Sequence, residues 1–214
     1  MYKGIVRVKR NFKFDPQMMR EEFSEKLSQK IKVIYGPVEN WKGICVKDKQ
    51  GVNLLEQLPE LQKLITQIGD ENIVNVFYYN LHKGSVQHIH RDLYGNGLFG
   101  CARLHVALQT NENAFLEVDH VKYHFGIGEI WSFDTSKVHR AINVGDEDRI
   151  HIVMDVKKNS ETLDLFPQKN WGFYPHIVAF VFYAVRKIFL GMFENKSTFS
   201  KNIKDTLSIF KSKT

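Results

Sequence analysis

The middle of the chain contains eight short apolar and β-branched segments: IVNVFYYNL (73–81), VQHIH (86–90), ARLHVAL (102–108), AFLEV (114–118), VKYHF (121–125), EIWSF (129–133), VHRAIN (138–143) and IHIVMDV (150–156). Turn residues separate them, among them Gly95-Asn96-Gly97 and Gly126–Gly128. Many short strands with little helix between them are typical of an antiparallel sandwich or barrel. We therefore expect a mainly β protein.

The segments that flank this core are predicted to form mainly helices, with a few short strands. Asp15-Pro16 is a helix start, and apolar residues at helical spacing follow it up to Ile31. A strand or two are expected within residues 4–14, a short strand at 41–46, a second helix at 53–68, and a third at 174–193. We expect a single domain over 1–214, with flanking helices and strands in 1–72, the catalytic core in 73–156, and a helix and basic tail in 157–214.

Composition limits the function classes. The chain has 214 residues, is 43% hydrophobic, and has a formal net charge of +6. Residues 186–214 hold seven cations and two anions, so this tail carries +5 of that charge and the rest of the chain only +1. Since the body has no net basic field, we expect no nucleic-acid partner. Two cysteines cannot build a disulfide framework, so we expect a cytoplasmic protein.

A metal site is suggested by the spacing of three residues. In His90-Arg91-Asp92, an imidazole and a carboxylate two residues apart share one face of a strand. His139, at the start of a later predicted strand, is the best candidate for a third ligand. Two imidazoles and one carboxylate form the facial triad of non-haem Fe(II) oxygenases, which leaves coordination positions open for other ligands.

Cations accompany this set. Arg149 is placed to bind the distal carboxylate of a 2-oxo acid. A surface pair with Asp146 or Asp148 is the alternative, which the order of the surrounding motifs makes less plausible. Arg103 and His105, two apart on one strand face, are suited to another carboxylate. Strand alternation places His151 on the face of Arg149, and we expect it to point into the pocket and tune substrate or cosubstrate binding.

In chain order, these motifs resemble the aspartyl/asparaginyl β-hydroxylase family over about residues 73–156. The resemblance implies a double-stranded β-helix (jelly-roll, cupin-like) core, Fe(II), 2-oxoglutarate as cosubstrate, and O₂. It implies His90, Asp92 and His139 as iron ligands, Arg149 on the distal carboxylate, and Arg103 with His105 near the 1-carboxylate.

The function implied is a dioxygenase that hydroxylates an unactivated C–H of an amino acid, an aspartyl- or asparaginyl-type residue, or a related small substrate, with a lipid acyl chain also open. Two alternatives stay open. One is a cupin-like metal-binding protein, and the other is a non-catalytic interaction module, since fold does not fix function.

The aromatic stretch from Trp171 to Val185 has three interpretations. Packing in the core or against a second copy as a homodimer is expected first, because apolar residues occur all round the helix. Contact with a membrane through 174–214 is the second, with the protein peripheral to it. A spanning helix is not expected, because Arg186 and Lys187 interrupt the apolar run.

Overall fold

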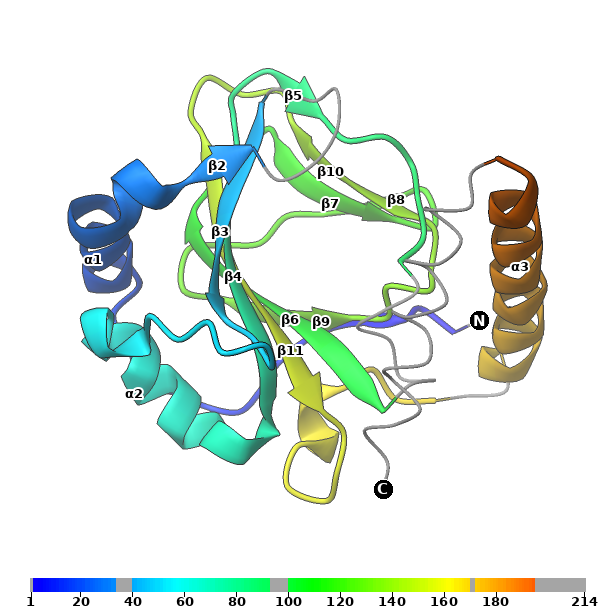
Figure 1. Cartoon of the computed structure of the whole chain (residues 1–214), viewed down its shortest axis with the longest axis horizontal. Helices are drawn as coiled ribbons and strands as arrows, with labels where there is room; N and C mark the ends of the chain where they lie inside the picture. Colours follow the sequence, from blue (N-terminus) through cyan, green and yellow to red (C-terminus); the bar gives the residue numbers. More distant parts are fainter. Residues whose placement is uncertain (1, 34–39, 93–99, 170–171, 195–214) are drawn as a thin grey trace. The chain divides into compact units, whose positions relative to one another are not determined.

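The computed structural model describes residues 2–33, 40–92, 100–169 and 172–194 (Figure 1). The chain forms two compact units. The larger is Lys3–Gln168, and the smaller combines Met1–Tyr2 with Lys169–Thr214. The single domain over 1–214 stays a prediction, and each unit is described by itself.

The larger unit is built on two antiparallel sheets. The strands are β1 (Ile5–Arg7), β2 (Lys32–Val33), β3 (Trp41–Lys47), β4 (Ile73–Leu81), β5 (Ser85–Val86), β6 (Cys101–Gln109), β7 (Ala114–Val118), β8 (Val121–Tyr123), β9 (Ile130–Phe133), β10 (His139–Asn143) and β11 (Arg149–Lys157). The larger sheet has the order β1-β9-β6-β11-β4-β3-β2, and the smaller has β5-β10-β7-β8. Figure 1 shows the smaller sheet facing part of the larger one. This is the jelly-roll arrangement that the sequence predicts.

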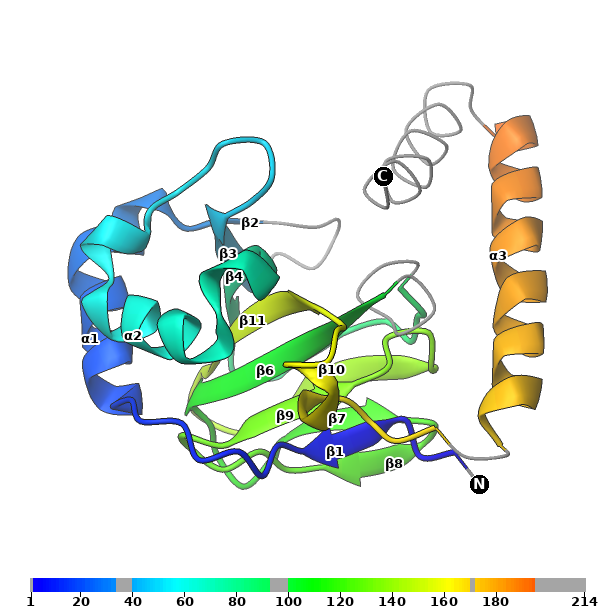
Figure 2. The ribbon, with the colours of Figure 1, turned by 90° about the horizontal axis from the view of Figure 1, so that it is seen from below.

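Two α-helices cover the outer face of the larger sheet (Figures 1 and 2). Helix α1 (Pro16–Leu27) begins as predicted, because the Asp15 carboxylate accepts hydrogen bonds from the backbone N–H groups of Gln17 and Met18. Helix α2 (Pro59–Ile68) is shorter than the predicted helix at 53–68. Proline disfavours helical backbone in the residue before it and suits the first helical position, so the α-helix starts at Pro59.

The connections contain short 3₁₀ turns at Ser28–Lys30, Leu55–Gln57, Asp70–Asn72 and Leu163–Leu165. Within the predicted strand region 4–14, only β1 forms, and it pairs with β9 at the sheet edge (Figure 2). Gly69, which ends α2, has φ +99°, a conformation that favours glycine.

Strand alternation produces two cores on opposite faces of the larger sheet. Even-numbered residues of β6 and β11 pack with Met19, Phe23 and Leu27 of α1 and with the apolar face of α2. On the other face, a smaller cluster lies between the sheets and comprises Ile5, Ala107, Leu116, Val118, Phe125 and Phe133. Odd-numbered residues of β6 and β11 are directed to this inner space, which positions the candidate site.

The smaller unit contains one long described helix, α3 (Phe173–Glu194), which is continuous in Figure 2. The ring of Phe173 meets that of Tyr2 edge to face, with ring centroids 5.2 Å apart. Over Phe173–Leu190 the mean hydropathy is 1.4, so length and composition alone would allow this helix to cross a membrane. Only 11% of this window is buried, so the expected packing in the core is not met.

Candidate metal centre

His90 and His139 are brought together by backbone pairing between distant segments. The N–H of His90 donates to the carbonyl of His139 at 3.0 Å, and the reverse bond is 2.9 Å. The N–H of Asp92 donates to the carbonyl of Thr135 at 2.9 Å. The predicted strand at 86–90 is realised only as β5, and His90 forms an isolated bridge instead. The three side chains thus converge by a local pairing rather than along a regular strand.

The three candidate ligands present one donor atom each to a common point. Their ligating atoms all lie within 4.8 Å of one another. Nε2 of His90 lies 3.6 Å from Oδ1 of Asp92, and Nε2 of His139 lies 3.8 Å from its Oδ2. This spacing is wide for direct hydrogen bonds but suits three ligands around one ion.

Backbone carbonyls fix the orientation of both imidazoles. Nδ1 of His90 lies 2.8 Å from the carbonyl oxygen of His88, and Nδ1 of His139 lies 2.9 Å from that of Lys137. Because a carbonyl oxygen only accepts, each Nδ1 carries the proton and each neutral ring keeps its lone pair on Nε2. Both lone pairs are therefore held toward Asp92, as metal ligation requires.

The protonation state of His139 also suits a metal. Burial lowers its pKa to about 4, against the opposing influence of Asp92. A ring that is neutral at pH 7 does not have to lose a proton before it binds a cation.

Arg103 connects the candidate ligand Asp92 to the sheet. Its Nη1 donates to Oδ2 of Asp92 at 2.7 Å, and its Nε donates to Oδ1 of Asp155 at 2.9 Å. Asp155 in turn accepts from Nδ2 of Asn75 at 3.0 Å. Burial alone would lower the pKa of Arg103, but Asp155 and Asp92 raise it above its usual value. Arg103 therefore holds Asp92 in place, and its role toward a cosubstrate stays a prediction.

Asp155 and Asn75 were not predicted to take part in the site. Asp155 stands on the same face of β11 as Arg149 and His151, so strand alternation was the signal that could have found it. Asn75 pairs with Asp155 in register on β4. That contact depends on the strand order, which the sequence does not display.

A second polar group lies deeper between the sheets, formed by His105 on β6 with Arg149 and His151 on β11. All three are buried, and His151 is only 1% exposed. Three of their nitrogen atoms have no hydrogen-bond partner among the residues that the structure describes: Nε2 of His105, Nη2 of Arg149 and Nε2 of His151. The Nδ1 atoms of the two histidines are 3.5 Å apart. Burying polar atoms without hydrogen-bond partners costs free energy of folding, so this group is suited to binding a polar ligand.

The electrostatics of this group favour an anion. Burial lowers the pKa of Arg149 to about 10, so the guanidinium is still charged at pH 7. Burial, followed by the charge of Arg149, lowers the pKa of His105 and of His151 well below the ordinary value. Phe125 stacks on His151 with ring centroids 5.7 Å apart, and Phe133 lies 5.2 Å from His105. One cation, two neutral imidazoles and aromatic walls can hold a carboxylate on a short carbon chain.

The structure also tests the alternative prediction for Arg149. The surface pairing of Arg149 is wrong, because Arg149 is buried and Asp148 instead accepts from Asn80, Lys83 and His82. Two neighbouring histidines lie outside the cluster of candidate ligands. His88 is exposed, and Nδ1 of His124 contacts the carbonyl oxygen of Ala114.

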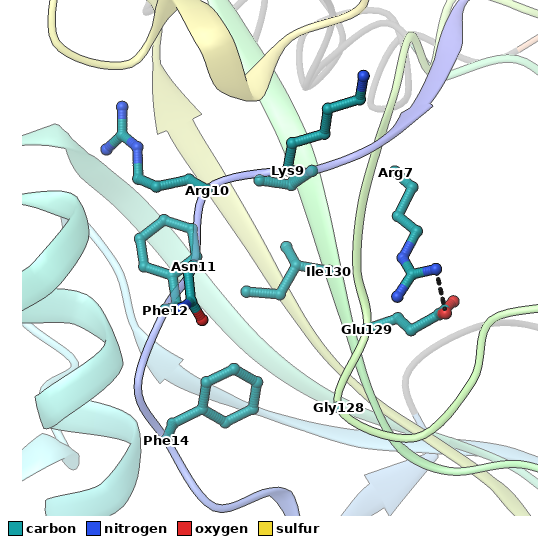
Figure 3. A pocket seen from close by; sticks show the side chains of 10 residues that line it. Arg7, Lys9, Arg10, Asn11, Phe12, Phe14, Gly128, Glu129 and Ile130 are labelled. Atoms are coloured by element: carbon teal, nitrogen blue, oxygen red, sulfur yellow. Dashed lines mark ion pairs between the residues drawn. The ribbon is translucent and has the colours of Figure 1, made fainter.

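A shallow groove of about 290 Å³ lies apart from these groups, beside β1 and the start of β9 (Figure 3). Arg7 closes one side through an ion pair with Glu129 at 2.9 Å. Its lining includes none of the candidate ligands or cosubstrate residues. We therefore place the candidate site at the two polar clusters between the sheets.

The donor set fits iron better than the common alternatives. Structural zinc usually takes four protein ligands, whereas calcium and magnesium prefer oxygen. Two imidazole nitrogens and one carboxylate match the Fe(II) facial triad. The role of Arg149 toward a 2-oxo acid cosubstrate stays a prediction.

The profile of a protein family described as aspartyl/asparaginyl beta-hydroxylase matches residues 9–159. The chain belongs to this family. The match confirms the resemblance seen in the motifs and extends it to α1 and α2. It also confirms the predicted enzyme class, an Fe(II)- and 2-oxoglutarate-dependent dioxygenase.

Solved structures share the fold at low sequence identity. The non-heme alpha ketoglutarate dependent carbocyclase SnoK from nogalamycin biosynthesis has a TM-score of 0.54 at 15% identity, over 73% of this chain and 80% of that chain. HygX from Streptomyces hygroscopicus, with nickel and 2-oxoglutarate bound, has a TM-score of 0.51 at 10% identity, over 74% and 84%. These likenesses confirm the jelly-roll fold. A comparison with curated proteins finds no match.

Proposed function

We propose that this enzyme hydroxylates an unactivated C–H bond of an amino acid, of an aspartyl- or asparaginyl-type residue, or of a related small substrate. The observation that carries the proposal is the convergence of His90, Asp92 and His139 in a fold that also buries polar nitrogens without described partners at His105, Arg149 and His151. When bound there, iron, 2-oxoglutarate and O₂ supply oxidative decarboxylation to succinate and CO₂, coupled to hydroxylation.

In this proposal His90, Asp92 and His139 hold the iron. The carbonyls of His88 and Lys137 keep both Nε2 lone pairs directed at it. Arg103 orients Asp92 and is itself oriented by Asp155. A charge-assisted bond at 2.7 Å limits the rotation of the carboxylate, so one oxygen stays available to the metal.

Arg149, His105 and His151 hold 2-oxoglutarate. The Nη2 donor of Arg149 has no described partner, and a bidentate carboxylate would satisfy it. His105 and His151 are both neutral near pH 7. The ring that accepts in their Nδ1–Nδ1 contact has its proton on Nε2 and can donate to the cosubstrate without a second full charge. Phe125 and Phe133 contact these rings.

The substrate class is inferred from the burial of the candidate site, because His139, Arg149 and His151 are all buried between the sheets. We therefore expect a free amino acid or another small molecule to be turned over faster than a folded protein.

The test is turnover of 2-oxoglutarate by the purified full chain with Fe(II), ascorbate and panels of amino acids, Asp- and Asn-containing peptides, and acyl lipids. We expect at least one candidate to stimulate succinate formation and to gain one hydroxyl group by mass spectrometry. Asp92→Ala should abolish the stimulation. Asp164→Ala, which removes an exposed carboxylate paired with Arg10, is the matched control and should leave it unchanged.

Metal-dependent succinate formation that is the same in wild type and Asp92→Ala would contradict the assignment of the iron ligand. Stimulation by a folded protein but by no small molecule or short peptide would contradict the proposed substrate class.

A further inference from the structure

Helix α3 exposes an apolar stripe along one side. Its residues recur every three or four positions, which places them on one face of the helix. The stripe consists of Tyr174, Val178, Val181, Phe182, Val185 and Phe189. Phe182 is 73% exposed and Val185 is 59% exposed, although apolar side chains of this size are usually buried.

The helix also has a distinct second side. Phe173 and Phe180, seven positions apart, are buried, at 6% and 0% exposed. By helical geometry they lie roughly opposite the stripe. These two side chains are buried, whereas those of the stripe are exposed.

Positive charge accompanies the stripe. Arg186 and Lys187 are exposed and directly follow Val185. Arg186 lies beside the stripe, whereas Lys187, seven positions after Phe180, lies on the opposite side of the helix. Five more lysines but only one aspartate occur in residues 195–214. An apolar stripe on a cationic helix complements a surface that is apolar inside and anionic at its edge, as a bilayer with acidic lipids is.

A second copy of this chain fits the stripe less well. Between Phe173 and Phe193 the helix contains no acidic residue, so a partner α3 would offer no carboxylate to Arg186 or Lys187 over this length. Crossing a bilayer is also disfavoured, because these adjacent cations would have to enter the hydrocarbon within the apolar window.

We propose that α3 lies along the surface of an anionic membrane, with its apolar stripe at the acyl boundary and Arg186 and Lys187 among the headgroups. The protein would then be a peripheral enzyme. This inference does not depend on the iron site or on the proposed substrate.

The test is flotation of the full chain with vesicles of phosphatidylcholine alone and of phosphatidylcholine with phosphatidylglycerol. We expect binding to the anionic vesicles, weaker binding to the neutral ones, and partial release by salt. Val185→Asp should weaken binding by about tenfold or more, because it removes apolar area and adds a negative charge. Val144→Asp is the matched control, because Val144 is 57% exposed in the larger unit, and it should bind as wild type does.

A second comparison separates charge from apolar contact. The double variant Arg186→Gln/Lys187→Gln should lose the preference for anionic vesicles while keeping the weak binding to neutral ones. Turnover of 2-oxoglutarate without vesicles should be unchanged in Val185→Asp, so failure of the membrane proposal is distinguishable from failure of the proposed function.

The proposal is overturned if wild type does not float with anionic vesicles, or if Val144→Asp and Val185→Asp lose binding equally. It is also overturned if the protein resists extraction from vesicles by alkaline carbonate, since that indicates a spanning helix. A concentration-dependent dimer that Val185→Asp dissociates, without any vesicle binding, would assign the stripe to a second copy instead.

Discussion

The two faces of β6 and β11 are chemically opposite. The face under the helices consists of apolar side chains: Ala102, Leu104, Val106, Leu108, Ile150, Ile152, Met154 and Val156. The face between the sheets holds cations, imidazoles and a carboxylate: Arg103, His105, Arg149, His151 and Asp155. The same two strands thus contribute one face to the apolar core and the other face to the candidate site.

The difference shows what each face does for the protein. Burying apolar side chains against α1 and α2 contributes stability roughly in proportion to the area removed from water. Burying Arg149, His105 and His151 with unpaired nitrogens costs stability instead. A fold keeps such groups where a ligand satisfies them, so stability and binding should separate by face when these residues are substituted.

The largest expected effect is on metal binding. His139→Ala should reduce the affinity for Fe(II), or for Co(II) as a spectroscopic substitute, by about 100-fold or more, because it removes a ligand rather than a supporting group. Titration with Co(II), followed by visible absorption, measures this. The matched control is His120→Ala, whose side chain is 79% exposed and which should bind as wild type does. Equal Co(II) affinities of wild type and both variants would show that His139 is not a metal ligand.

The next effect concerns the apolar face. Leu104 is fully buried beneath the helices, so Leu104→Ala should lower the free energy of unfolding by about 2–5 kcal/mol. Urea denaturation of the metal-free protein measures this value. Val144→Ala, at an exposed position, should change it by less than about 0.5 kcal/mol. A loss below 1 kcal/mol for Leu104→Ala would mean that this face is not the stabilising core.

Substitution of Arg149 should weaken ligand binding without lowering the free energy of unfolding. Arg149→Met should weaken 2-oxoglutarate binding by about tenfold or more, because it removes the charged partner of the carboxylate. The free energy of unfolding should be unchanged or higher by about 1 kcal/mol, because a buried guanidinium without a full set of partners is replaced by an apolar chain. Calorimetric titration and urea denaturation measure the two quantities. Loss of stability with unchanged 2-oxoglutarate affinity would reverse the assignment of the two faces.

The smallest effect is a dependence of stability on pH. His105 and His151 have pKa values well below 6.5 in the fold, first because of burial and then because of Arg149. As pH falls through about 6.5, the unfolded chain gains protons that these rings do not take up, so the folded state loses stability. His151→Phe should make this decline shallower in urea denaturation between about pH 8 and pH 5.5. An identical decline in the variant would show that His151 does not contribute to it.

Much of this organisation could be predicted from the sequence, because it is local. Period-two alternation in 150–156 predicts both faces of β11, and Asp15-Pro16 predicts the start of α1. The candidate ligands His90, Asp92 and His139 followed from residue type and spacing, and the structure brings all three together.

The rest depends on pairing between distant segments. The bridge between His90 and His139 replaces the expected strand at 86–90, and no pattern within that segment encodes it. The contact from Asn75 through Asp155 to Arg103 requires β4, β11 and β6 to be neighbours in that order. The predicted helix at 53–68 is confirmed only from Pro59 on, and its start was misplaced for a local reason, since Pro59 was present in the sequence as a start signal.

In the proposed site, one face of β6 and β11 binds 2-oxoglutarate beside iron held by His90, Asp92 and His139. The most direct measurement is the visible spectrum of the protein after anaerobic addition of Fe(II) and then 2-oxoglutarate. We expect a metal-to-ligand charge-transfer band in wild type that is absent in Asp92→Ala and weakened in Arg149→Met at equal 2-oxoglutarate. The absence of a band in wild type, or a band unchanged in both variants, would contradict the claim.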